Sequence, residues 1–204
     1  MAERRHGHLA PPTETSMHSA DWYGEDISGK AHTRVAFVDL DMTEVTNNGS
    51  VFDECTFRGG RFNVSTHTDA AFLNCTACSF FDATFERCKM VGSTFDRCNF
   101  SMMKAIGGNW SFVGLPGAHL GNASFDGTNM REVDLVCTDF TGGKLINAEL
   151  TGTWFHHANL SGCDLRGSNL ISVDPATTEL KNAIITIDQA IVLATALGLD
   201  VRGM

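Results

Sequence analysis

Large apolar residues recur at every fifth position through most of this 204-residue chain. Counting in fives from Phe80 to Leu180 gives twenty-one positions, and nineteen of them hold Leu, Phe, Met or Trp. The residue two places before each large residue is Val or smaller in nineteen of twenty cases. An α-helix repeats every 3.6 residues and a strand every two, so neither explains a period of five. The chain must therefore be interpreted as a repeat before local propensities are considered.

This pattern predicts a solenoid in which the large and the small residue of each unit point inward. Each unit supplies a short extended side and a corner, and four units close a square coil of about twenty residues. Successive coils stack at the strand spacing of about 4.8 Å. Glycine is common two places after the large residue, where a corner needs unusual backbone angles. Leucine-rich repeats and calcium-binding β-rolls have other periods, and so do hexapeptide helices.

The N-terminal part keeps the period in a different phase from Phe37 to Phe72, with His67 at one of the large positions. We expect His67 to be buried and hydrogen-bonded. Between Ala77 and Phe80 the step is three residues instead of five. Two residues are missing there, which predicts a local kink.

Composition limits the class of protein. The formal net charge of −9 opposes direct nucleic-acid binding, which needs Lys and Arg, and it suits a basic partner. No apolar run approaches the length of a membrane span, and the start of the chain lacks the apolar stretch of a signal peptide. We therefore expect a cytoplasmic protein whose seven cysteines are reduced.

The residues that could carry chemistry have simpler explanations. Cys75 and Cys78 have the spacing of a metal or redox pair, but both fall in the small inward slot, so core packing is expected. Only Cys137 is predicted to point outward. His156 and His157 lie on an outside corner beside an exposed Trp154 and are expected to be plain surface or a partner contact. No nucleophile with a base, cleft or phosphate loop is evident, so we expect no enzyme activity, no metal and no cofactor.

The C-terminal segment from 183 to 199, AIITIDQAIVLATALGL, predicts a short helix. Thr186 and Gln189 have the spacing of a capping box, and Gly198 suits the end of the helix. The helix is apolar nearly all round, so we expect it to be covered on two sides. We expect the last coil to cover one side and a second chain to cover the other.

The segment ANLSGCDLRGSNL, residues 158–170, resembles the pentapeptide repeat family, and the resemblance extends over about residues 22–185. It implies a right-handed quadrilateral β-helix. The expected domains are a flexible N-terminal tail (1–20), the β-helix (21–185), and a dimerisation helix with its tail (186–204).

The segments Val173-Asp174-Pro175 and FERCKMVGSTF, together with the terminal helix, resemble the mycobacterial fluoroquinolone-resistance (MfpA-type) members of that family. The resemblance implies a homodimer joined through the helix, and a rod that mimics B-form DNA and engages DNA gyrase. In the family this inhibits gyrase or protects it from fluoroquinolones and other poisons. The expected dimer interface consists of Ile187, Ala190, Ile191, Leu193, Ala194 and Leu197.

The acidic outer faces of the rod are the expected site of partner binding. The candidate residues are Asp96, Asp126, Glu132, Asp134, Asp139, Glu149 and Asp164. About eight coils would make a rod roughly 40 Å long, so the average charge is much sparser than the one charge per about 1.7 Å of DNA. Local concentration of acids would have to compensate. The alternative is a structural or scaffolding repeat protein that binds another protein partner.

Overall fold

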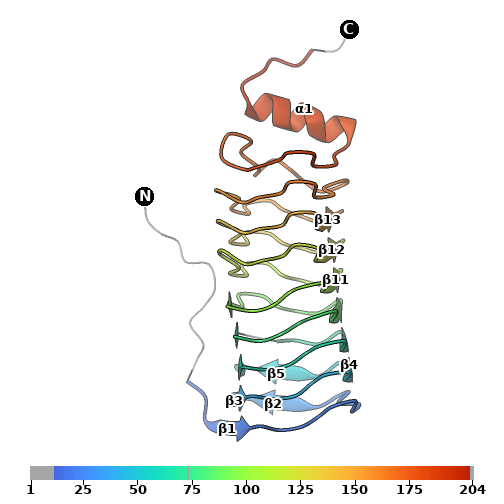
Figure 1. The fold of residues 1–204 in the computed structure, drawn as a ribbon, viewed down its shortest axis with the longest axis vertical. Helices are drawn as coiled ribbons and strands as arrows, with labels where there is room; N and C mark the ends of the chain where they lie inside the picture. The colour runs from blue at the N-terminus through green and yellow to red at the C-terminus, as the bar shows by residue number, and fades with distance from the viewer. Residues whose placement is uncertain (1–11, 73, 203–204) are drawn as a thin grey trace.

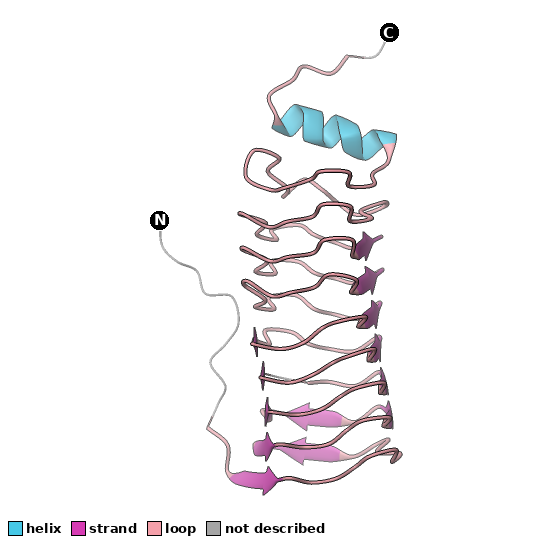
Figure 2. Cartoon of the chain, in the orientation of Figure 1, coloured by secondary structure: helices cyan, strands magenta, loops and turns pink. Residues whose placement is uncertain are grey.

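Short parallel strands stack into the walls of a four-sided coil (Figure 1, Figure 2). The structure is a computed structural model, which describes residues 12–72 and 74–202. Strand partners are usually twenty residues apart, as in the pairs Lys104–Ser124 and Ala105–Phe125. A period of five with partners at twenty gives four corners per coil. The predicted all-β solenoid is confirmed.

Three walls contain named strands within the described residues. The β1 wall is a parallel sheet in the order β1 (Thr15–His18), β3 (Val35–Val38), β6 (Thr56–Arg58), β8 (Cys75–Thr76) and β10 (Phe95–Asp96). The β4 wall has the order β13 (Lys144–Ile146), β12 (Ser124–Asp126), β11 (Lys104–Ile106), β9 (Thr84–Glu86), β7 (Thr66–Thr68) and β4 (Thr46–Asn48). The β2 wall contains β2 (Ala31–Thr33) and β5 (Val51–Asp53).

The fourth wall, called here the bridge wall, is joined by single parallel bridges such as Asp41–Arg61 and Ser79–Asn99. Helix α1 (Ile187–Ala196) follows the last coil and lies across its open end (Figure 1). At the other end, β1 pairs with β3 and lies inside the segment 1–20 that the sequence predicts as a tail. Residues 1–11 lie outside the described residues. No helix among the described residues is long and apolar enough to cross a membrane.

The core consists of ladders of large side chains stacked from coil to coil. Every fifth residue from Phe80 to Leu170 is buried, as the repeat predicts. The rings of Phe62 and Phe80 stack with centroids 4.9 Å apart, and those of Phe80 and Phe100 stack at 5.5 Å. Neighbouring walls contribute edge-to-face contacts, such as Phe80 with Phe85 at 5.8 Å. Burying one such side chain contributes about 1.5–3 kcal/mol, so the ladders dominate the stability.

One coil is shortened, but not at the step that the sequence predicts. Cys75 pairs with Phe57 across eighteen residues and with Phe95 across twenty, so Cys75 occupies a large-residue position. The backbone turns with positive φ at Asn74 and again at Ala77, and Ala77 is exposed. The short step therefore runs from Phe72 to Cys75, and Ala77 is a corner, not a core position.

The shortened coil is closed by a side chain. Asn74 is buried, and its Oδ1 accepts hydrogen bonds from the backbone N of Thr94 at 3.1 Å and from the Thr94 hydroxyl at 2.9 Å. These bonds replace ladder contacts that a coil two residues shorter cannot make. The sequence pattern could not locate this step, because Cys75 and Ala77 are both small. Either one could fill the next large-residue position after Phe72.

His67 is fully buried in a ladder, between Asn47 on the preceding coil and Phe85 on the next. Its ring stacks on Phe85 at 5.0 Å between centroids, its Nδ1 lies 3.1 Å from Asn47 Nδ2, and its Nε2 lies 2.9 Å from Ser65 Oγ. The Ser65 hydroxyl donates to the Phe62 carbonyl at 2.6 Å, so it accepts from His67. Asn47 can only donate from Nδ2, so His67 carries its proton on Nε2. The predicted buried, hydrogen-bonded histidine is confirmed.

His67 makes the stability of the fold depend on pH. Burial lowers its pKa from 6.5 to about 3, so the unfolded chain takes up the proton first as the pH falls. The stabilisation is complete above pH 6.5 and is lost progressively toward pH 3. Between pH 7 and pH 5 we expect a loss of about 2 kcal/mol in the free energy of unfolding. Urea titrations across this range measure the slope.

His67→Phe should flatten this slope, although not abolish it, because burial also lowers the pKa of His32. The matched control is His119→Asn, which removes a histidine whose side chain is 89% exposed and should keep the slope. An identical slope in His67→Phe and the unmodified chain would contradict the assignment.

Candidate partner-binding surface and helix face

Four of the seven candidate acids belong to the turns of the coil. Asp134, Asp139, Glu149 and Asp164, called here the turn acids, each come directly before a large inward residue. Each accepts a hydrogen bond from the backbone N two residues later, for example Asp139 from Thr141 at 3.0 Å. Asn109, Asn129, Asn159 and Asn169 make the same bond at the same place in other units. The primary role of these carboxylates is therefore to stabilise the turn.

Hydrogen bonds lower the pKa of three of the turn acids, Asp139, Glu149 and Asp164. Hydrogen bonds from the Thr141 hydroxyl and backbone hold the pKa of Asp139 below its usual value, and Thr151 does the same for the pKa of Glu149. The pKa of Asp164 is lowered mainly by its hydrogen bonds from Arg166. Asp134 and Asp164 are 9% and 8% exposed, so their residues are largely buried in the wall.

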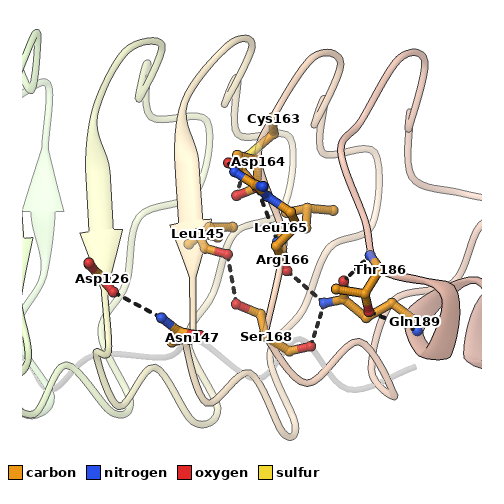
Figure 3. Close-up of polar contacts among 10 residues, drawn as sticks. All are labelled: Asp126, Leu145, Asn147, Cys163, Asp164, Leu165, Arg166, Ser168, Thr186 and Gln189. Carbon is orange, nitrogen blue, oxygen red and sulfur yellow. Dashed lines mark hydrogen bonds and ion pairs between the residues drawn. The ribbon is translucent and has the colours of Figure 1, made fainter.

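The remaining three candidates are more open. Asp126, on β12, is exposed, and its Oδ1 accepts a 3.4 Å hydrogen bond from Asn147 Nδ2 (Figure 3). Asp96, on β10, forms a 3.0 Å ion pair with Arg97. Glu132 is half-buried at a corner where φ is +53°.

The structure does not gather the seven acids on one wall. Asp96 and Asp134 are on the β1 wall, Asp126 and Asp164 on the β4 wall, and Asp139 on the bridge wall. Glu149 lies in bridge register on the β2 wall, and Glu132 is at a corner. Arg166 pairs with Asp164 at 2.7 Å, and Arg97 pairs with Asp96. The surface is acidic on all sides, with part of its charge neutralised locally.

Helix α1 is held to the last coil by Gln189 (Figure 3). Its Nε2 donates to the carbonyls of Leu165 at 2.6 Å and Ser168 at 2.7 Å. Its Oε1 accepts from Thr186 N at 2.8 Å, and its own N–H donates to the Thr186 hydroxyl, which confirms the predicted capping box. Ser168 continues the chain of bonds by donating to the Leu145 carbonyl at 2.7 Å. One side chain thus caps both the helix and the open edge of the solenoid.

The two faces of α1 have different surroundings. Leu193 is half-buried and packs against the core of its own chain, and Ala194 is also half-buried. Ile187 is 84% exposed and Ile191 45% exposed, and Ala190 and Leu197 are exposed as well. Of the expected interface residues, Leu193 therefore packs on the coil below and Ala194 is half-buried. Four others leave an apolar face uncovered in the single chain, namely Ile187, Ala190, Ile191 and Leu197.

The cysteines and the histidine pair lie largely as the sequence indicates. Cys137 is exposed, and Cys75 and Cys78 are buried. His156 and His157 are exposed with ring centroids 3.9 Å apart, whereas Trp154 is half-buried, not exposed as expected. Among residues 12–72 and 74–202, no three His, Cys, Asp or Glu side chains are grouped so that they could hold a metal ion.

Comparison with known proteins identifies the repeat. Residues 115–152 and 134–170 match the family model described as pentapeptide repeats. Residues 115–170 are therefore pentapeptide repeats. No curated protein sequence matches this chain.

Two solved structures share the fold of this chain. Both are trypsin-treated variants of QnrB1, a plasmid-mediated fluoroquinolone resistance protein. One is 22% identical, with a TM-score of 0.55 over 91% of this chain and 99% of the other. The second is 20% identical, with a TM-score of 0.53 over 92% of this chain and all of the other. At this identity the likeness concerns the fold.

The second role of Gln189 is the main feature that sequence reasoning missed in this chain. The capping box was visible in the spacing of Thr186 and Gln189. The bonds to Leu165 and Ser168 join positions 24 and 21 residues apart and depend on how the helix crosses the coil. A single signal was available, namely that a long amide in the first turn of an apolar helix needs a buried partner.

Replacing Gln189 tests how far the helix depends on this cap. Gln189→Ala leaves two carbonyls of the last coil without their donor, which should lower the free energy of unfolding by about 2 kcal/mol. Gln189→Glu keeps an oxygen acceptor for the capping box but loses the Nε2 donor group, so it should lower the free energy of unfolding by about as much. Hydrogen–deuterium exchange of residues 187–199 should accelerate in both variants. Normal protection in Gln189→Glu would show that the capping box alone holds the helix.

Proposed function

We propose that this protein binds DNA gyrase as a DNA mimic. It modulates or protects the enzyme and so gives tolerance to fluoroquinolones or other gyrase poisons. The observation that carries the proposal is the acidic rod itself, which has the fold of a fluoroquinolone resistance protein along nearly its whole length. A straight, narrow solenoid with carboxylates on every wall presents negative charge in a regular array, as a duplex does.

The turn acids support this proposal through their rigidity. A carboxylate held by a backbone N–H occupies one position, and its low pKa keeps it charged. The four turn acids lie on four different walls, so such fixed groups are present on every side of the rod. A basic surface that binds phosphates would then meet fixed negative charges without ordering flexible side chains, which lowers the entropic cost of binding.

The turn acids can be neutralised without disturbing the fold. Asp134→Asn, Asp139→Asn and Asp164→Asn together replace three carboxylates by the residue that already fills this turn elsewhere. We expect the triple variant to fold normally and to need about tenfold more protein for the same effect on gyrase, since complementary charge drives association. A supercoiling assay, run with and without ciprofloxacin, measures the effect.

Asp200→Asn is the matched control for this assay, because Asp200 lies beyond the helix and outside the rod. It should behave like the unmodified protein. If micromolar unmodified protein changes supercoiling in neither condition, gyrase is not the target. If the triple variant is as active as the unmodified chain, the turn acids are not the binding groups.

A second candidate function, a scaffold that binds another protein, is favoured by one observation. The bridge wall and its following corner expose Val64, Phe81 and Met102, between 43% and 50% each, on consecutive coils. Val64 also adopts a positive φ of 55°, which is costly for a β-branched residue. An apolar patch of this kind would not contribute to the mimicry of a negatively charged duplex. Phe81→Ser should weaken binding of such a partner and leave the gyrase assay unchanged.

The proposal includes a homodimer joined through the uncovered face of α1. Lys in place of Ile187 and Ile191 should prevent dimerisation, because the paired faces could not bury the added charges. Leu193 is left unchanged, since a charge there would detach the helix from its own coil. Light scattering should give the mass of two 22.1 kDa chains for the unmodified protein and of one for the variant.

The control for this experiment is Ile106→Lys, which adds a charge at a 46% exposed isoleucine on β11, several coils from the helix (Figure 1). It should remain dimeric. A monomeric unmodified protein, or a dimeric double variant, would remove the helix from this role.

A further inference from the structure

A cavity of about 260 Å³ opens on the β1 wall near its C-terminal end. Its lining includes Trp154, Phe155, His156, Ser172 and Asp174. Phe155 is buried, Trp154 and Ser172 are half-buried, and Asp174 and His156 are exposed. The lining therefore combines a buried and a half-buried aromatic residue with an exposed carboxylate, and Thr153, Thr177 and Thr178 complete it.

The cavity exists because the coil ladder is interrupted at this point. One coil earlier the ladder is regular: Leu135 N donates to Trp154 O at 2.9 Å, and Trp154 N donates to Val133 O at 2.9 Å. On the next coil the carbonyl of Asp174 instead accepts from Thr177 N at 3.1 Å and Thr178 N at 3.0 Å, in a local turn. Pro175 stands where the inward residue is expected and has no N–H to donate.

The lining has the chemistry of a cation site. Asp174 is the only Asp or Glu in the lining, and neither Lys nor Arg lines it. Its carboxylate is fixed by Ala176 N at 2.9 Å from Oδ1 and by the Thr177 hydroxyl at 3.1 Å from Oδ2. Each of these oxygens keeps a further lone pair for a ligand. Asp134, in bridge register with Trp154 on the preceding coil, is a further acidic residue next to the cavity lining.

We propose that this cavity binds the guanidinium group of an arginine side chain from a partner protein. The planar group stacks on Trp154 and donates to the carboxylate of Asp174, a combination that suits arginine better than lysine. The flanking walls, which carry the net negative charge of the chain, favour the basic segment around that arginine. This inference rests on the proposed function in one respect, namely that the partner is a protein. It adds the chemistry of one contact with that partner.

A peptide titration tests the cavity independently of gyrase. The probes are acetyl-Gly-Arg-Gly-amide and the matching citrulline peptide, which has nearly the same shape but no charge. The readout is the indole N–H resonance of Trp154 in ¹H–¹⁵N spectra of the full-length protein, assigned with a Trp154→Phe variant. We expect a saturable shift with the arginine peptide at millimolar concentration, and at least fivefold weaker binding of the citrulline peptide.

Asp174→Asn removes the charge while the amide oxygen can still accept from Ala176 N, so the local turn is retained. We expect at least a fivefold loss of affinity for the arginine peptide. Asp200→Asn, beyond the helix and outside the rod, is the matched control and should bind normally. An unshifted Trp154, equal binding of the citrulline peptide, or unchanged affinity in Asp174→Asn would each overturn the proposal.

The two proposals fail separately. Binding of the arginine peptide with no effect on supercoiling would retain the cavity and assign its arginine to a partner other than gyrase. An effect on supercoiling without peptide binding would retain gyrase and reject the cavity. If both hold, Asp174→Asn should reduce the effect on gyrase by about threefold or more, whereas the control Asp200→Asn should not reduce it.

Discussion

Stacking of one inward side chain on the equivalent side chain of the next coil is the interaction on which this structure depends. The phenyl rings of Phe62, Phe80 and Phe100 are held about one strand spacing apart because their backbones are hydrogen-bonded in parallel register. Neither contribution is sufficient alone. A single coil buries too little apolar surface to be stable, and a stack without matched side chains would leave gaps.

This dependence explains how the chain accommodates irregularities. Asn47 and His67 fill large-residue positions on adjacent coils and form a buried polar triad with Ser65, which fills a small-residue position. The triad is tolerated because each ring nitrogen of His67 has a partner. A coil two residues short is tolerated because Asn74 reaches the backbone of the next coil. In both cases a buried polar group is satisfied by a neighbour whose position the ladder determines.

The ends and the outer walls are stabilised by hydrogen bonds to the backbone and not by ladder stacking. The last coil exposes carbonyls that would otherwise pair with another chain, and Gln189 satisfies two of them while anchoring the helix. On the walls, the turn acids serve the fold through their backbone bonds and the surface through their charge. Because asparagine serves the turn equally well, the choice of aspartate at Asp134, Asp139 and Asp164 is a property of the surface and not of the fold.

The sequence by itself determined the period, the inward positions, the solenoid and the terminal helix, because each of these repeats or depends on neighbours within a few residues. It also indicated the buried state of His67. The tertiary structure alone decided the location of the short step, the double role of Gln189, the distribution of the acids and the cavity beside Trp154. These features arise from contacts between coils some twenty residues apart, where the outcome depends on whether one coil closes fully onto the next. A local pattern records which side chains point inward, but not where the ladder between two coils is interrupted.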